Sequence, residues 1–178
     1  ELNYLAGRPV PLYAYLYHEY LRNFMGNQVS CGLTNEKDSM RYRMAYSFTA
    51  GDSMTLVLTP TGELFTNWGN HDFSRLPDRE KALDLVANLC RFYREGAGKY
   101  LHNGRMIPAL PMECGQKAFF MEWYGRDCII PSVYTTAWLA DDGTKAQIFV
   151  NPGDAPETVT VGGREITVPA RNVVMMAL

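Results

Sequence analysis

The chain has 178 residues, of which 47% are hydrophobic, 12% aromatic and 20% charged, and its formal net charge at pH 7 is −2. This balance is typical of a globular protein and excludes an intrinsically disordered chain. The charges are of mixed sign without a basic block, so no nucleic-acid-binding surface is predicted. No apolar run approaches the length of a membrane span, so no transmembrane helix is predicted.

The cysteines are far apart in the sequence, at Cys31, Cys90, Cys114 and Cys128. They form no C-x-x-C pair and no cluster with histidine at the spacing of metal ligands, so we expect free thiols rather than a zinc site, with disulfide pairing as the less favoured alternative. The chain begins at Glu1 without an initiator methionine or signal-peptide features. We therefore expect a piece of a longer protein, and secretion or a periplasmic location in a bacterium would depend on a signal peptide upstream.

The first predicted elements are a strand and a helix. Residues 10–17 are an apolar and aromatic run without polar alternation, which is typical of a strand buried on both faces of a parallel sheet. A long polar loop over 18–37 follows. Residues 39–49 carry apolar side chains at helical spacing, and Gly51 is suited to end that helix.

The same order then repeats. Residues 54–58 predict a second short buried strand, and residues 59–77 a second long loop. Asp78 is a helix-capping residue before an amphipathic stretch that reaches residue 95. Strand, loop and helix occurring twice predict two β/α units of a parallel sheet, which would need further strands to cover them.

After residue 104 the pattern changes to short alternating strands separated by turn signals. We expect strands over 118–124, 132–139, 146–151, 158–161, 165–168 and 173–177. Hairpin turns are predicted at 141–143, 152–154 and 162–163. Together these features predict an antiparallel β-sandwich or half-barrel.

Two stretches resemble parts of bacterial glycoside hydrolases. WLADDG at 138–143, followed by QIFVNPGDAP at 147–156, is similar to the end of many glycosidase accessory domains. PLYAYLYHE at 11–19 resembles the seventh strand of a (β/α)8 barrel in such enzymes. The predicted fold is therefore α/β followed by all-β: residues 1–104 as strands seven and eight of a partial barrel, and residues 105–178 as the sandwich.

The resemblance implies a carbohydrate substrate and names Glu19 as a catalytic carboxylate. Glycoside hydrolysis requires two carboxyl groups that flank the scissile bond. Glu19 would be one of them, and the second would lie on an earlier strand that this chain does not contain. The alternative is that Glu19 stabilises the start of a short helix in the following loop.

Substrate-binding residues are expected on the two loops that follow the predicted strands, because barrel enzymes place their active sites there. Tyr17 and His18 leave the first strand beside Glu19, and His18 could equally be structural. The second loop carries Trp68, Asn70, His71 and Asp72, an aromatic platform with hydrogen-bonding side chains. The turn at Asp52 would lie on the opposite face, so Asp52 is not expected in the site.

The sequence predicts no metal and no cofactor, because His18, His71 and Asp72 lack metal-ligand spacing and no nucleotide-binding motif is present. A set of aromatic residues in the strand region, Trp123, Tyr124, Tyr134 and Trp138, is expected in the core rather than on a glycan-binding face. The predicted function is a fragment of a glycoside hydrolase, inactive alone, whose partners are a saccharide and the remainder of the barrel. The alternatives are a non-catalytic carbohydrate-binding or structural module and a self-contained α+β domain.

Overall fold

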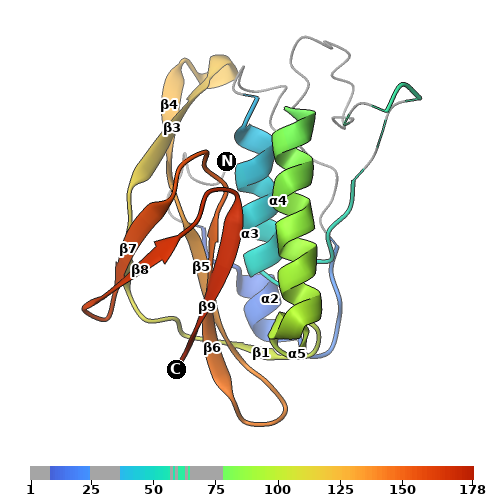
Figure 1. The fold of residues 1–178 in the computed structure, drawn as a ribbon, viewed down its shortest axis with the longest axis vertical. Coiled ribbons are helices and arrows are strands. Elements are labelled where there is room, and N and C mark those ends of the chain that lie inside the picture. The colour runs from blue at the N-terminus through green and yellow to red at the C-terminus, as the bar shows by residue number, and fades with distance from the viewer. Residues whose placement is uncertain (1–8, 25–36, 57, 59, 63, 65–77) are drawn as a thin grey trace.

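A computed structural model describes residues 9–24, 37–56, 58, 60–62, 64 and 78–178. The helices come first along the chain and the strands follow (Figure 1). The helical elements are α2 (Leu12–Tyr17), α3 (Ser39–Thr49), α4 (Arg79–Phe92), the turn η3 (Tyr93–Ala97) and α5 (Gly98–Leu101), with the 3-10 turn η4 (Glu122–Tyr124) among the strands. The strands are β1 (Arg105–Ile107), β2 (Met112–Glu113), β3 (Gln116–Met121), β4 (Arg126–Pro131), β5 (Tyr134–Leu139), β6 (Lys145–Asn151), β7 (Glu157–Val161), β8 (Arg164–Val168) and β9 (Asn172–Ala177).

The strands β1 to β9 pair with one another only in the antiparallel direction. A four-stranded sheet has the order β1-β5-β6-β9, a three-stranded sheet the order β2-β7-β8, and β3 pairs with β4 alone. The β7–β8 hairpin turns at Gly162 and Gly163, whose φ angles of 55° and 79° are of the kind a two-residue hairpin turn requires. The predicted all-β character of the C-terminal region and the hairpins at 141–143 and 162–163 are confirmed.

The four-stranded sheet lies between two apolar layers. Helices α3 and α4 pack on its strands β5, β6 and β9 (Figure 1). Because successive residues of a strand face opposite sides, Ile148 and Val150 enter the core beneath the helices, whereas Phe149 enters the core shared with the three-stranded sheet. One sheet thus supports both the helices and the rest of the sandwich.

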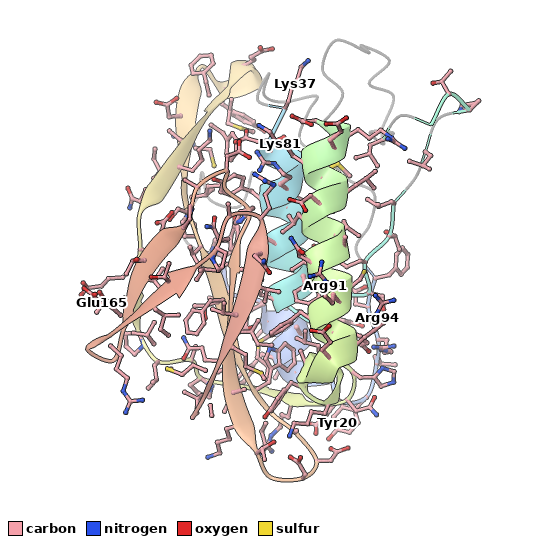
Figure 2. The ribbon with its side chains drawn as sticks, in the orientation of Figure 1. Tyr20, Lys37, Lys81, Arg91, Arg94 and Glu165 are labelled. Atoms are coloured by element: carbon pink, nitrogen blue, oxygen red, sulfur yellow. The ribbon has the colours of Figure 1, made fainter. Side chains whose placement is uncertain are left out.

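An ion-pair network joins the helices to the strand region at Asp154. The buried guanidinium of Arg41 in α3 donates to both carboxylate oxygens of Asp154, at 2.9 and 3.2 Å, and to the Pro152 carbonyl at 2.6 Å. Lys81 of α4, labelled in Figure 2, and Arg171 also donate to Asp154. Burial raises the pKa of Asp154, but the hydrogen bonds from these cations outweigh it and lower that pKa to about 2.

The predicted helices are confirmed and the first predicted strand is wrong. Residues 39–49 and 79–92 are helical, and the Asp78 side chain accepts from the Lys81 amide, as a helix cap does. Residues 10–17, by contrast, contain helix α2. Short apolar runs suit a buried strand or a buried helix equally, and Pro11 starts the helix while its carbonyl accepts from the Tyr15 amide at 2.9 Å.

Other strand predictions also need correction. Within 54–58, residues 54–56 are not in a strand; next to them, Ser53 and Leu58 form only isolated bridges, to Phe24 and Leu64. Residues 152–154 do not close a hairpin, because β6 pairs with β5 and β9 while β7 belongs to the other sheet. Strands β1, β2 and β4 were not predicted at all. The described residues therefore contain mixed helices and antiparallel sheets, without a parallel sheet.

Candidate functional site

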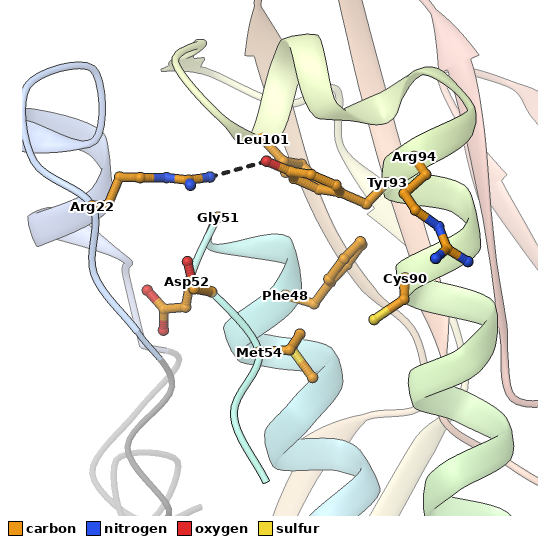
Figure 3. A pocket seen from close by; sticks show the side chains of 10 residues that line it. Arg22, Phe48, Gly51, Asp52, Met54, Cys90, Tyr93, Arg94 and Leu101 are labelled. Atoms are coloured by element: carbon orange, nitrogen blue, oxygen red, sulfur yellow. Dashed lines mark hydrogen bonds between the residues drawn. The ribbon is translucent and has the colours of Figure 1, made fainter.

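A cavity of about 360 Å³ opens between the segment after α2, the end of α3 and the turn that follows α4 (Figure 3). We call it the Asp52 pocket. Its walls come from stretches far apart in the sequence and combine apolar with charged side chains. The lining residues are Arg22, Phe48, Gly51, Asp52, Ser53, Met54, Cys90, Tyr93, Arg94 and Leu101.

Gly51 directs the chain from α3 along the pocket. Its φ of 83° lies in the left-handed region that favours glycine, and a Cβ at this position would approach His18 Nε2 to 2.3 Å. The Asp52 amide then donates to the Ser47 carbonyl, and the Ser53 amide donates to the Asn23 carbonyl, each at 3.0 Å. These bonds fix Asp52 against the pocket wall.

The opposite wall depends on a kink at the end of α4. Gly96 has a φ of 145°, which interrupts the helical backbone between α4 and α5. The kink places Tyr93 and Arg94 beside the cavity and Leu101 at its edge (Figure 3). Cys90, one turn earlier, is not in a disulfide, and neither are Cys114 and Cys128, so the prediction is confirmed for these three; Cys31 lies outside the described residues.

Two hydrogen-bond groups form the polar part of the pocket. The Tyr93 hydroxyl accepts from Arg22 Nη2 at 3.0 Å and lies 2.8 Å from His102 Nδ1, to which it can donate. Asp52 Oδ1 accepts from the Asn23 amide at 3.1 Å. Phe48, Met54 and Leu101 contribute an apolar floor to the same pocket.

The environment of Asp52 favours its protonated form. Burial raises the pKa of Asp52, and the hydrogen bonds from Asn23 and Ser47 and the charges of Arg43 and His18 oppose that rise only in part. Asp52 is therefore protonated at a higher pH than an exposed aspartate. A carboxyl of this kind can donate a hydrogen bond or a proton to a bound ligand.

The residues predicted from the first loop, Tyr17, His18 and Glu19, do not line the pocket. Tyr17 is half exposed and packs against Tyr13, with ring centroids 5.4 Å apart. Glu19 is exposed on the turn after α2, and no described residue forms a hydrogen bond or ion pair with it. In this helical setting Glu19 does not sit at the end of a strand.

His18 is buried and holds α2 to the rest of the molecule. Its Nδ1 lies 3.0 Å from the Gly104 carbonyl and its Nε2 lies 3.2 Å from the Gly51 carbonyl. The ring also meets Trp138 edge-on, with centroids 4.6 Å apart. Both ring nitrogens therefore already face main-chain oxygens, and a sugar contact from His18 stays a prediction.

The remaining predicted site residues, Trp68, Asn70, His71 and Asp72, lie outside the described residues. The predicted core position of Trp138 and Tyr134 is confirmed, whereas Tyr124 is half exposed. In the part of the chain that the structure describes, no cluster of acidic, histidine and cysteine side chains is arranged to hold a metal ion. No described helix is long and apolar enough to cross a membrane.

Asp52, which the sequence argument left out of the predicted site, lines the pocket described above. The expectation that it lies away from the site followed from the barrel prediction, which placed the turn after α3 on the structural face. The local signal was a carboxyl directly after a helix-ending glycine. Its hydrogen-bond partner Asn23, and the pocket residues Arg22 and Tyr93, come from distant segments. Comparisons with known proteins give no match: no family model, curated protein or solved structure is similar to the chain.

Proposed function

We propose that the chain belongs to a carbohydrate-active protein and that a sugar unit binds in the Asp52 pocket. The observation that carries this proposal is the combination, in one cavity, of an apolar floor with a carboxyl, a phenol and a guanidinium. Sugars present the same combination, because their rings have apolar C–H faces and their hydroxyls require donors and acceptors.

The size of the pocket fits this proposal. Its volume of about 360 Å³ lies at the lower end of the range of small-molecule sites, about 300–1,000 Å³. Phe48, Met54 and Leu101 give the pocket an apolar lining for the C–H face of a sugar, while Asp52 and Tyr93 offer hydrogen bonds to its hydroxyls. The proposed role of this chain is therefore binding, which corresponds to a carbohydrate-binding module.

Glycoside hydrolysis is the second candidate function, and the raised pKa of Asp52 is the observation that favours it. A general acid for hydrolysis needs a raised pKa, and burial raises the pKa of Asp52. Glu19 is proposed as the nucleophilic carboxylate, on the turn that leads to Arg22 at the pocket. No cofactor is part of this proposal.

The proposed partner of α2 is the remainder of a (β/α)8 barrel. Leu12, Tyr13, Leu16 and Tyr17 are each about half exposed although the helix is apolar on all sides. A helix of that composition is normally buried in the core of a larger domain. Such a partner would cover α2 and bring further residues to the neighbouring Asp52 pocket.

Calorimetric titration with methyl glycosides tests the binding proposal. Asp52→Asn and Tyr93→Phe each remove one hydrogen-bonding function, so each should weaken binding by about fivefold to tenfold. Asp142→Asn and Tyr124→Phe are matched controls, because both residues lie in the strand region and are at least half exposed. Absence of binding by the unchanged protein, or equal losses in the controls, would overturn the proposal.

The hydrolase candidate needs a separate test in the complete protein. Glu19→Gln should lower the turnover of an aryl glycoside by at least about a hundredfold, since loss of a catalytic carboxylate removes a chemical step. Glu165→Gln, at an exposed residue of β8 that is labelled in Figure 2, is the control. Turnover within several-fold of the unchanged protein would exclude catalysis by Glu19.

A further inference from the structure

We propose that the Asp52 pocket selects a sugar that carries an anionic group, of the uronic acid type, over a neutral sugar, because two guanidinium groups line it and neither forms an ion pair with a described carboxylate. The proposal rests on the proposed function and adds the class of ligand. Its evidence is the placement of Arg22 and Arg94 and the way in which other arginines of the chain are paired.

Arg22 reaches the pocket from the segment after α2. Its one hydrogen bond among the described residues goes from Nη2 to the neutral Tyr93 hydroxyl, at 3.0 Å (Figure 3). A guanidinium has five N–H donors, so most of those on Arg22 remain available. The bond to Tyr93 holds the side chain at the pocket, and within residues 9–24, 37–56 and 78–178 no carboxylate forms an ion pair with it.

Arg94 lines the same pocket from the kinked turn η3. Within the part of the chain that the structure describes, no carboxylate and no hydrogen-bond acceptor pairs with it. Arg91, three residues earlier and also labelled in Figure 2, donates instead to the Asn88 side chain at 2.9 Å and does not line the pocket. The two arginines therefore differ in surroundings although they share a helical segment.

Two arginines away from the pocket are paired with acids, whereas Arg79 donates to the Gly62 carbonyl. Arg41 is bound by both oxygens of Asp154, and Arg171 donates to Asp84 at 2.7 Å and to Asp154 at 3.0 Å. Two guanidinium groups line the pocket, and the carboxyl of Asp52 is the one acidic group among the described lining residues. The pocket thus carries an excess of positive charge over an apolar floor.

A carboxylate on a sugar ring would use this excess. Guanidinium groups bind carboxylates through two parallel N–H···O bonds, which are stronger than hydrogen bonds between neutral groups. The ring of the sugar would meet the Phe48 side of the cavity, and its carboxylate would face the arginines. A neutral sugar would form no charge-assisted bonds with the two arginines and so would gain less.

The test compares two probes on the full chain: methyl β-glucuronide and methyl β-glucoside, which differ at one carbon. At low ionic strength the glucuronide should bind about five to twenty times more tightly than the glucoside, the gain typical of charge-assisted hydrogen bonds. Arg94→Gln and Arg22→Gln should each reduce that preference by about threefold or more, and Arg94→Lys should keep part of it. Arg91→Gln is the matched control and should leave the preference unchanged.

The outcomes separate this inference from the proposed function. Equal affinity for the two glycosides, or an equal effect of Arg94→Gln and Arg91→Gln, would overturn the inference and leave sugar binding standing. Failure of both glycosides to bind would overturn the proposed function and the inference with it. Inorganic phosphate or acetate that binds as tightly as the glucuronide would also overturn the inference, because the site would then recognise an anion without its sugar.

Discussion

The C-terminal strands bury their apolar side chains, whereas helix α2 leaves most of its apolar side chains exposed. Along β6, successive residues enter two separate cores, and Ile148 and Phe149 are both fully buried. Within α2, only Ala14 is buried, whereas Leu12 and Leu16 are 59% and 48% exposed. The strands with α3 and α4 therefore complete their own core. Helix α2 instead offers an apolar surface beside a charged pocket, which is where we place function.

The largest effect should come from the core of the strand region. Trp138 is fully buried in β5, donates to Thr136 Oγ1 at 2.8 Å and packs against His18. Trp138→Ala should lower the free energy of unfolding by about 3–5 kcal/mol, through lost burial and the cavity left behind. Denaturant unfolding measures this, with the half-exposed Tyr124→Ala as control. Equal losses in the two variants would contradict the account of the core.

The next largest effect should come from the network that joins the helices to the strands. Asp154→Ala leaves the buried guanidinium of Arg41 without its carboxylate and should cost about 2 kcal/mol. The pKa of Asp154 is lowered to about 2. The contribution of Asp154 to the stability of the fold should therefore be present above about pH 4 and be lost as the pH falls towards 2.

Urea unfolding at several pH values checks this prediction. The difference between the unchanged protein and Asp154→Ala should shrink on acidification. Asp142→Ala removes an exposed partner of Lys99 and should cost much less. A loss for Asp154→Ala that is no larger than the loss for Asp142→Ala would show that the network does not join the two regions.

A smaller effect of opposite sign is expected at Asp52. Burial raises the pKa of Asp52, so its contribution to stability is full at pH values below its unfolded pKa and is lost as the pH rises through its folded pKa. Because asparagine does not ionise, the free energy of unfolding of Asp52→Asn, relative to that of the unchanged protein, should increase from acidic to neutral pH. Asp142→Asn should show the reverse trend, because hydrogen bonds from Lys99 and Thr144 lower the pKa of Asp142. The same trend in both variants would contradict the assignment.

The smallest effect on folding is expected on α2. Leu16→Gln changes an exposed apolar side chain and should alter the free energy of unfolding of the chain by less than about 0.5 kcal/mol. The same substitution should weaken association with the rest of the proposed barrel, which analytical ultracentrifugation of the two parts would measure. Strong destabilisation of the isolated chain would mean that α2 is already covered, and the contrast with the strands would fail.

The parts of the fold that the sequence predicted are those with local signals. Helix α4 has an apolar stripe and the capping residue Asp78, and the β7–β8 hairpin has alternation and two glycines. Strand β4 begins with Arg126 and Asp127 and ends with Pro131, so its identity depends on pairing with β3 rather than on its own pattern. The apolar run of α2 is compatible with a buried strand or with a helix, and its surroundings in the fold decide between the two.

The candidate site was harder to predict because its residues meet only through the fold. Asp52 and Tyr93 belong to separate elements, and Arg22 joins them from a third segment. Sequence spacing carries no information about such a meeting. His18 was named as a candidate substrate-binding residue, which stays a prediction; its two carbonyl contacts depend on Gly51 and Gly104, which no local pattern connects to it.

An NMR titration of the full chain with methyl β-glucoside and methyl β-glucuronide would test most directly whether a sugar binds in the Asp52 pocket. Saturable shifts should concentrate on the amides of Gly51, Asp52, Tyr93 and Arg94, and should weaken in Asp52→Asn, while the amides of β7 and β8 stay unchanged. Shifts confined to the strand region, or equally large shifts in Asp52→Asn, would contradict the proposal that this pocket is the functional site.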